Sequence, residues 1–228
     1  MFLKKFVVAA IGALFCTAVA AEAVDYRLPS QIQPTAQSIY LKLDPAKEDF
    51  TGSTVLQIDV AEDVDRIGIY QIDVAMHNIT LRSGSGERSL TAEVADYDIN
   101  WLSDGDVIAA GQYELSIEFS AKYSTDALGL HRTHFEGNDY LFTQMEAMYL
   151  RRAVPSFDEP SFKMPYTLTI EAPEGLAVVA NTPVAAESRM DGWQRVEFMP
   201  TKTISSYLVA LAVGPLDRVP IDGLSVPG

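Results

Sequence analysis

The sequence predicts an all-β fold, a large, antiparallel and bent β-sandwich, and three observations support this prediction. Apolar and polar residues alternate with a period of two along many short segments that are rich in β-branched and aromatic residues. Clusters of turn-forming residues separate these segments. No window of a dozen or more residues has helical periodicity, so the strands are expected to pair without intervening helices.

The alternation defines the expected strands one by one. Ser38 to Leu43 alternates between polar and apolar side chains, and Ser53 to Val60 repeats the pattern. Segments of the same character are 67–70, 76–82, 113–119, 140–143, 166–170, 176–180, 195–198 and 207–213. Turn signals lie at 84–86, 104–106, 136–139 and 191–193, so most of the connections are expected to be tight.

Residues 1–20 have the composition of a secretory leader. Lys4 and Lys5 give it a positive start, residues 6–15 form an uncharged apolar run, and Ala18-Val19-Ala20 is a small-residue cleavage site. Cleavage after Ala23 is the alternative. The apolar run is too short to span a membrane, which takes about 20 residues. We therefore expect an exported chain, periplasmic or secreted, with no membrane span after cleavage.

We expect residues 21–215 to form one β domain and residues 216–228, which are rich in Pro and Gly, to form a linker or the start of a further domain. Cys16 is the only cysteine and lies in the leader, preceded by Phe15 where a lipoprotein leader has a small residue. The mature domain therefore has no disulfide and no thiolate, and its stability must come from a buried core.

The chain is strongly acidic. Its formal net charge is −14, and loss of the leader, which carries two lysines and no acid, would make it −16. This charge opposes binding to nucleic acid or to an anionic membrane. A solvated acidic surface is the simplest interpretation, and attraction for cationic peptides is the alternative.

The three histidines do not have the spacing of a metal site. Zinc peptidases carry H-E-x-x-H on a helix, which puts both imidazoles on one face. His131 and His134 are spaced H-x-x-H and are followed at once by Gly137-Asn138, so a helix is not expected there. His77 lies in an alternating segment and is interpreted as a sheet residue. We expect no metal ligand in this chain.

The sequence also contains no motif for nucleophilic catalysis or for a pair of catalytic carboxylates. The sequence has no G-x-S-x-G and no Gly-rich phosphate loop before a helix. Asp158 and Glu159 are adjacent carboxylates, but neighbouring side chains point apart on an extended chain, unlike a facing acid/base pair. No catalytic residue is therefore predicted.

The segment from Thr143 to Lys163 is the most specific part of the sequence, and it reads T-Q-M-E-A-M-Y-L-R-R-A-V-P-S-F-D-E-P-S-F-K. It resembles the T-Q-x-E-x-x-x-A-R-x-x-F-P-C-F-D-E-P-x-x-K signature of the aminopeptidase N family of zinc peptidases. Weaker matches in the same order are Tyr26-Arg27-Leu28-Pro29, Phe50-Thr51-Gly52, Gly129 to Thr133 and Asn181-Thr182-Pro183. Departures from the signature fall at packing positions: Leu150, Val154 and Ser156.

The resemblance implies roles for the motif residues. Gln144 would line the pocket for the first side chain of the substrate, and Glu146 would accept hydrogen bonds from its free α-amino group. A peptide without a free N-terminus would leave this carboxylate buried and unpaired. Such peptides would therefore be rejected. The remaining motif residues are interpreted as scaffold or anchors of the loop: Tyr149, Arg151, Phe157, Asp158, Glu159, Pro160 and Lys163.

In the resembled family, the G-A-M-E-N motif and the H-E-x-x-H zinc site lie in the next domain, and neither motif occurs in this sequence. We therefore expect no cofactor in this chain, zinc in the full-length family enzyme, and no hydrolysis by this chain alone. The expected partners are peptide N-termini and a catalytic domain, in cis or in trans. The alternatives are a free-standing β-sandwich that binds peptides or a protein, and a half-enzyme that docks on a separate catalytic chain.

Overall fold

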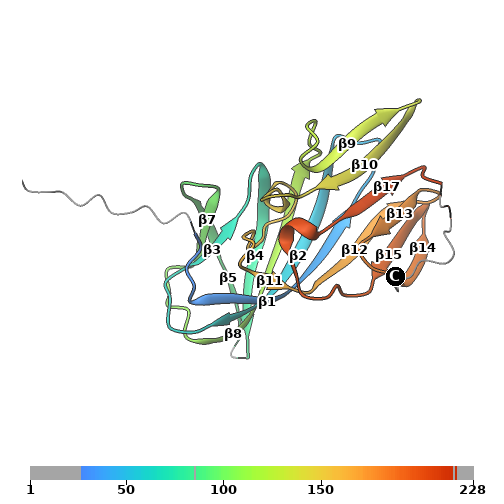
Figure 1. Ribbon diagram of the computed structural model, residues 1–228. Helices are drawn as coiled ribbons and strands as arrows, with labels where there is room; N and C mark the ends of the chain where they lie inside the picture. Colours follow the sequence, from blue (N-terminus) through green and yellow to red (C-terminus); the bar gives the residue numbers. More distant parts are fainter. Residues whose placement is uncertain (1–26, 85, 218, 220–228) are drawn as a thin grey trace, which may run out of the picture.

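The computed structural model describes residues 27–84, 86–217 and 219. The leader, its cleavage sites and most of the expected linker lie outside the described residues. Within them the chain forms seventeen strands, two short 3-10 turns and no α-helix, which confirms the all-β prediction (Figure 1). None of the described helices is long and apolar enough to cross a membrane.

The largest sheet has eight strands in the order β14-β15-β12-β1-β2-β8-β4-β5. Alternate side chains of each central strand are buried, so one face of the sheet covers the core, as the period-two pattern predicts. The strands are β1 (Ile32–Lys42), β2 (Asp49–Val60), β4 (Val74–Ser83), β5 (Gly86–Ser89), β8 (Gly111–Lys122), β12 (Tyr166–Pro173), β14 (Val184–Met190) and β15 (Trp193–Phe198).

One pair in this sheet is parallel, unlike the antiparallel pairing expected throughout. β1 and β12 run in the same direction, with Gln37 beside Tyr166 and Leu41 beside Ile170. Parallel neighbours need a long connection, and here more than a hundred residues separate the two strands. That connection contains β2, β4, β5 and β8 of the same sheet and the three-stranded sheet, together with β9, β10 and β11, before the chain returns to the edge of β1.

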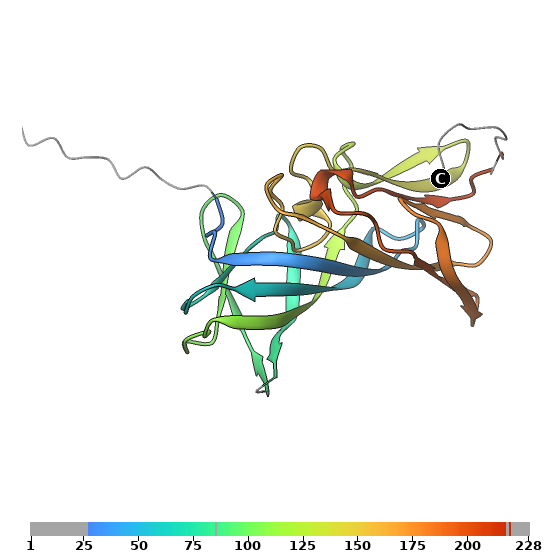
Figure 2. The same ribbon diagram turned by 60° about the horizontal axis from the view of Figure 1, so that its bottom comes forward.

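Three smaller sheets complete the fold (Figures 1 and 2). A four-stranded sheet has the order β13-β17-β10-β9, a three-stranded sheet the order β3-β7-β6, and β11 pairs with β16. Their bounds are β3 (Ile67–Tyr70), β6 (Thr91–Val94), β7 (Ile99–Ser103), β9 (Gly129–Phe135), β10 (Asn138–Gln144), β11 (Lys163–Met164), β13 (Ala177–Ala180), β16 (Ile204–Ser205) and β17 (Leu211–Gly214). The 3-10 turns are η1 (Leu150–Arg152) and η2 (Ser206–Leu208).

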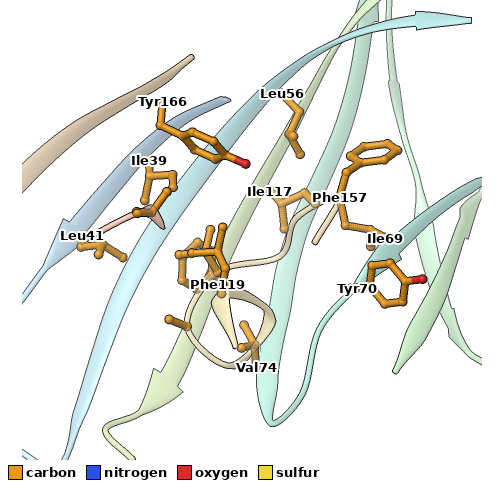
Figure 3. Packing of buried hydrophobic residues seen from close by; sticks show 14 of the residues in the cluster. Ile39, Leu41, Leu56, Ile69, Tyr70, Val74, Ile117, Phe119, Phe157 and Tyr166 are labelled. Atoms are coloured by element: carbon orange, nitrogen blue, oxygen red, sulfur yellow. The ribbon is translucent and has the colours of Figure 1, made fainter. Parts of the chain in front are cut away.

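The core lies between the large sheet and these smaller layers. Leu56, Ile117 and Phe119 reach it from β2 and β8, and Tyr166 reaches it from β12 (Figure 3). Phe157, from the motif loop after η1, is 1% exposed and packs edge-on against Phe162. Burying such a side chain contributes about 1.5–3 kcal/mol. Phe157 is therefore a core anchor, as expected from the sequence.

The four-stranded sheet packs its apolar face on the large sheet. Leu130 and Leu211 from the small sheet and Ile39, Leu41 and Leu168 from the large one line the same small apolar gap. Thr143, near the end of β10 where the motif begins, lines the same gap, and in Figure 1 β10 runs from the outer tip of its hairpin toward the middle of the domain.

Candidate functional site

Gln144 and Glu146 stand on the surface at the end of β10. Gln144 is the last residue of the strand, both side chains are exposed, and Met145 between them is 4% exposed. The Oε1 atom of Gln144 accepts a hydrogen bond from the backbone N–H of Glu146, at 2.8 Å. The peptide bond between Glu146 and Ala147 is cis. Both polar side chains lie on the open surface, and the side chain of Gln144 is tied to the backbone of Glu146.

The end of β10 is fixed on both sides. Thr143 accepts a hydrogen bond from the N–H of Leu211 at 2.9 Å and donates to its carbonyl at 3.3 Å. On the other side, Gln144 lies opposite Gly129 of β9. Gly129 has φ +67°, and a Cβ there would lie 3.0 Å from Cβ of Arg152, so glycine suits this close approach.

A buried ion pair lies behind this edge. Nε of Arg151 lies 3.1 Å from Oδ2 of Asp158, and the two residues are 5% and 1% exposed. The guanidinium also donates to the backbone carbonyl of Asp158 at 2.6 Å, and its carbon lies 3.8 Å from the centre of the Tyr70 ring. The hydroxyl of Ser206 donates to the other carboxylate oxygen. Charges so deeply buried require such complete partnering.

Glu159 points to a different set of partners from Asp158. Its Oε1 atom accepts hydrogen bonds from the backbone N–H of Leu28, at 2.7 Å, and from the hydroxyl of Tyr70, at 2.9 Å. Burial and this bond to Glu159 raise the pKa of Tyr70 well above its ordinary value, so the hydroxyl remains a donor. The two adjacent carboxylates diverge, as expected, and do not form a facing pair.

The other motif residues contribute through the backbone or through packing. The carbonyl of Pro160 accepts a hydrogen bond from Ser205, at 3.2 Å, and Lys163 lies opposite the same Ser205 in the β11–β16 pair. The side chain of Lys163 is exposed, and the pairing of its charge stays a prediction. The three departures from the family signature are all buried, which confirms them as packing positions: Leu150, Val154 and Ser156.

The described residues do not fit a zinc ion. His131 and His134 lie three apart on β9, so their side chains point to opposite faces. His131 packs on Phe142, with Nδ1 buried and unpartnered, and His134 has its Nδ1 atom 3.0 Å from Asp139. Among the residues that the structure describes, no three His, Cys, Asp or Glu side chains form a group able to hold a metal. His77 is an exposed residue of β4, beside Ser120.

Two surface depressions lie near the motif loop. The larger, about 700 Å³, is lined by residues from the ends of β2 and β8 together with Arg152. The other, about 510 Å³, adjoins the turn after Glu146 and is lined in part by Tyr70, Met148 and Arg151. Neither depression is lined by Gln144 or Glu146. The pair therefore occupies an open ledge rather than an enclosed pocket.

Sequence reasoning located the motif but missed the residues that complete its contacts. Tyr70, Ser206 and Leu28 come from segments far from the loop in sequence. Asp98, whose Oδ2 lies 3.4 Å from Nη1 of Arg151, comes from the β6–β7 turn. Leu28 belongs to a weak motif match and Tyr70 to an alternating segment, but no local pattern shows which segments the fold brings against the loop.

The described part of the chain is an all-β domain in which a buried arginine–aspartate pair lies behind an exposed polar edge. Residues 33–208 match the family model of the peptidase M1 N-terminal domain, and the chain belongs to this family.

Curated relatives agree with this membership. The chain is 36% identical over 197 residues to an aminopeptidase N of Streptomyces lividans, a match that covers 83% of this chain and 22% of that protein. It is 28% identical over 221 residues to human aminopeptidase N, covering 85% of this chain and 22% of the relative. A rice protein, aminopeptidase M1-C, is 27% identical over 197 residues. The chain thus spans under a quarter of the length of these relatives.

Proposed function

We propose that this domain supplies the wall that binds the substrate N-terminus in an exported zinc aminopeptidase. The observation that supports the proposal best is the exposure of Gln144 and Glu146 on one ledge, on either side of the buried Met145. Among the described residues, the carboxylate of Glu146 has no hydrogen-bond partner. A second surface placed against this ledge would meet an unpaired carboxylate.

The two side chains offer complementary chemistry. The carboxylate of Glu146 can accept charge-assisted hydrogen bonds from a protonated α-amino group. The carbonyl oxygen of Gln144 already accepts the N–H of Glu146, so the amide nitrogen remains as a donor toward the open side. An acyl-blocked peptide offers no ammonium and leaves the acid unpaired once the cleft closes, which disfavours such substrates.

The contacts behind Gln144 and Glu146 hold these two residues in a fixed position. Thr143 joins β10 to β17 through two hydrogen bonds, and the buried Arg151–Asp158 pair closes the loop that follows Glu146. Catalytic and binding groups act best when rigid elements hold them within about 0.5 Å of the productive position.

We further propose that hydrolysis requires a second domain that carries the zinc ligands. Zinc would polarise the scissile carbonyl and activate water there. The present residues would bind and orient the substrate amine. On this proposal the isolated chain releases no product from aminoacyl-arylamides, and zinc-dependent turnover by the purified chain would contradict it.

The role of Glu146 is tested in a chimera in which this domain replaces the matching part of the Streptomyces lividans relative. Glu146→Gln keeps the shape and removes the charge, and we expect kcat/KM for a free-amine substrate to fall about 10- to 100-fold, as for loss of a hydrogen bond to a charged group. Glu136→Gln, an exposed acid in the β9–β10 turn, is the control. Equal kcat/KM values for Glu146→Gln and the parent chimera would refute the assignment.

A further inference from the structure

The strand at one edge of the large sheet is exposed along its whole length. β14 (Val184–Met190) ends the order of the eight-stranded sheet, and every residue in it is exposed (Figure 1). The other edge, β5, has only four residues. An exposed edge presents unpaired N–H and C=O groups that can pair with another chain.

The hairpin geometry tells which backbone groups of β14 face outward. Asp191 and Gly192 have φ values of +53° and +78°, and they form a two-residue turn between Met190 and Trp193. The residues that flank such a turn form a hydrogen-bonded pair. Met190 therefore directs its N–H and C=O toward β15, and by alternation those of Arg189 face outward.

The same alternation continues along the strand. Ser188 faces β15 opposite Arg195, and the backbone groups of Glu187 face outward like those of Arg189. The register shift in this pair lies farther on, between Val184 and Ala186. The free edge thus offers the backbone groups of one acidic and one basic residue, two positions apart.

We propose that β14 is a self-pairing edge through which two copies of this chain associate about a two-fold axis at Ser188. This register places Glu187 of each copy opposite Arg189 of the other, and it joins outward backbone groups to outward backbone groups. Within one copy Nη2 of Arg189 already lies 2.9 Å from Oε1 of Glu187, so association extends this exposed ion pair across the interface. Opposite charges directly across an antiparallel pair stabilise it. The inference is independent of the role proposed for Gln144 and Glu146.

The neighbouring two-fold registers are disfavoured. An axis at Glu187 would set two glutamates opposite each other, and an axis at Arg189 two arginines, and like charges directly opposite destabilise a pair. An axis at Ala186 would bring Arg189 opposite Pro183, which has no N–H to donate. Edge strands commonly avoid pairing by carrying charged side chains, especially lysine. This strand carries both signs in a self-complementary order.

Apolar surface near the same edge favours a second copy over a solvated edge. Met190 is 75% exposed and Val184 is 44% exposed. In the Ser188 register, Met190 of each copy lies opposite Ala186 of the other, so pairing covers part of its side chain. The net charge of −14 repels other copies at long range, but salt screens this beyond about 8 Å at physiological ionic strength.

Sedimentation of the full chain in a Cys16→Ser background, at physiological ionic strength, tests the proposal. We expect a monomer–dimer equilibrium in which Glu187→Arg raises the dissociation constant about tenfold or more, because two attractive pairs become repulsive. The double swap Glu187→Arg/Arg189→Glu should restore association. Glu87→Arg, the same charge change on the edge strand β5, should leave it unchanged.

Cross-linking tests the register itself. Two Ser188 residues would form a non-hydrogen-bonded pair with Cβ atoms about 4.5–5.5 Å apart, close to the range that a disulfide needs. Under mild oxidation, Ser188→Cys should give a covalent dimer, and Met190→Cys, on the same face of the strand, should not. A monomer at all concentrations up to about 1 mM, an unaltered dimer in Glu187→Arg, or equal cross-linking at both positions would overturn the proposal.

Discussion

Arg151 and Asp158 form an ion pair in the interior of the domain, with Nε of Arg151 3.1 Å from Oδ2 of Asp158. The same carboxylate oxygen accepts the backbone N–H of Arg151 at 3.2 Å, so one acid holds both the side chain and the backbone of one arginine. The Tyr70 ring covers the guanidinium. This arrangement closes the loop behind Gln144 and Glu146 and makes the loop part of the core.

Removing the carboxylate of Asp158 should destabilise the domain. Asp158→Ala leaves the buried guanidinium of Arg151 with only the partly exposed Asp98, 3.4 Å away, as a counter-ion, and we expect the free energy of unfolding to fall by about 3 kcal/mol. Urea denaturation followed by tryptophan fluorescence measures the change. Glu87→Gln, which breaks an exposed ion pair with Arg82, should cost less than about 1 kcal/mol. Comparable losses in the two variants would argue against a special role for the buried pair.

Gly52 in β2 should tolerate no side chain. A Cβ at this position would lie 2.6 Å from the carbonyl oxygen of Tyr40 and 2.8 Å from Cζ of Phe119. Since the carbonyl belongs to the neighbouring strand, Gly52→Ala should force β1 and β2 apart and destabilise the domain by about 1–3 kcal/mol. Gly84→Ala, where a Cβ meets nothing within 4 Å, is the matched control in a thermal melt. An unchanged melting temperature for Gly52→Ala would contradict the contact.

Thr143 should hold the end of β10 through its hydroxyl. Thr143→Val keeps the shape and removes both bonds to Leu211, so a loss of about 1–2 kcal/mol is expected. Amide exchange at Leu211 should also become faster. Thr91→Val removes one exposed bond to Ser103 and should have a smaller effect. Exchange at Leu211 that stayed as slow as in the parent chain would count against this role.

Tyr40 should ionise at a higher pH than an ordinary tyrosine. Burial, the hydrogen bond to Glu171 at 2.8 Å and the charge of Glu171 raise the pKa of Tyr40 from 10.0 to about 12. Because the folded pKa lies above the unfolded value, the stabilisation is complete below pH 10 and is lost as the pH rises through about 12. The titration of Tyr40 is the difference in phenolate absorbance between the parent chain and Tyr40→Phe. Glu171→Gln should lower this pKa, and an unchanged value would show that Glu171 does not cause the shift.

The strands that sequence reasoning predicted best are those with one buried face. Ser53 to Val60 and Tyr113 to Phe119 alternate strictly and lie inside β2 and β8, which pair along their whole length. β14 was missed because all its residues are exposed and no apolar alternation marks it. The Asp191-Gly192 turn beside it was predicted, since turn chemistry is local.

Segment 207–213 shows how tertiary contacts change a local pattern. The alternation predicts a strand throughout, but residues 206–208 form η2 and β17 begins only at Leu211. The hydroxyl of Ser206 bonds to the buried Asp158, and the N–H of Val209 bonds back to Ser206. A buried carboxylate from a distant loop thus competes with strand pairing and shortens the strand.

Local sequence was enough to predict the all-β class, most strand positions and the place of the Thr143–Lys163 motif, because alternation, turn residues and motif spacing act over a few residues. The parallel pairing of β1 with β12, the partners of Arg151 and Glu159, and the outward direction of Gln144 and Glu146 became visible only in the folded chain. These features depend on how distant segments meet when the core closes, and local periodicity does not specify which buried face or buried charge will meet which partner.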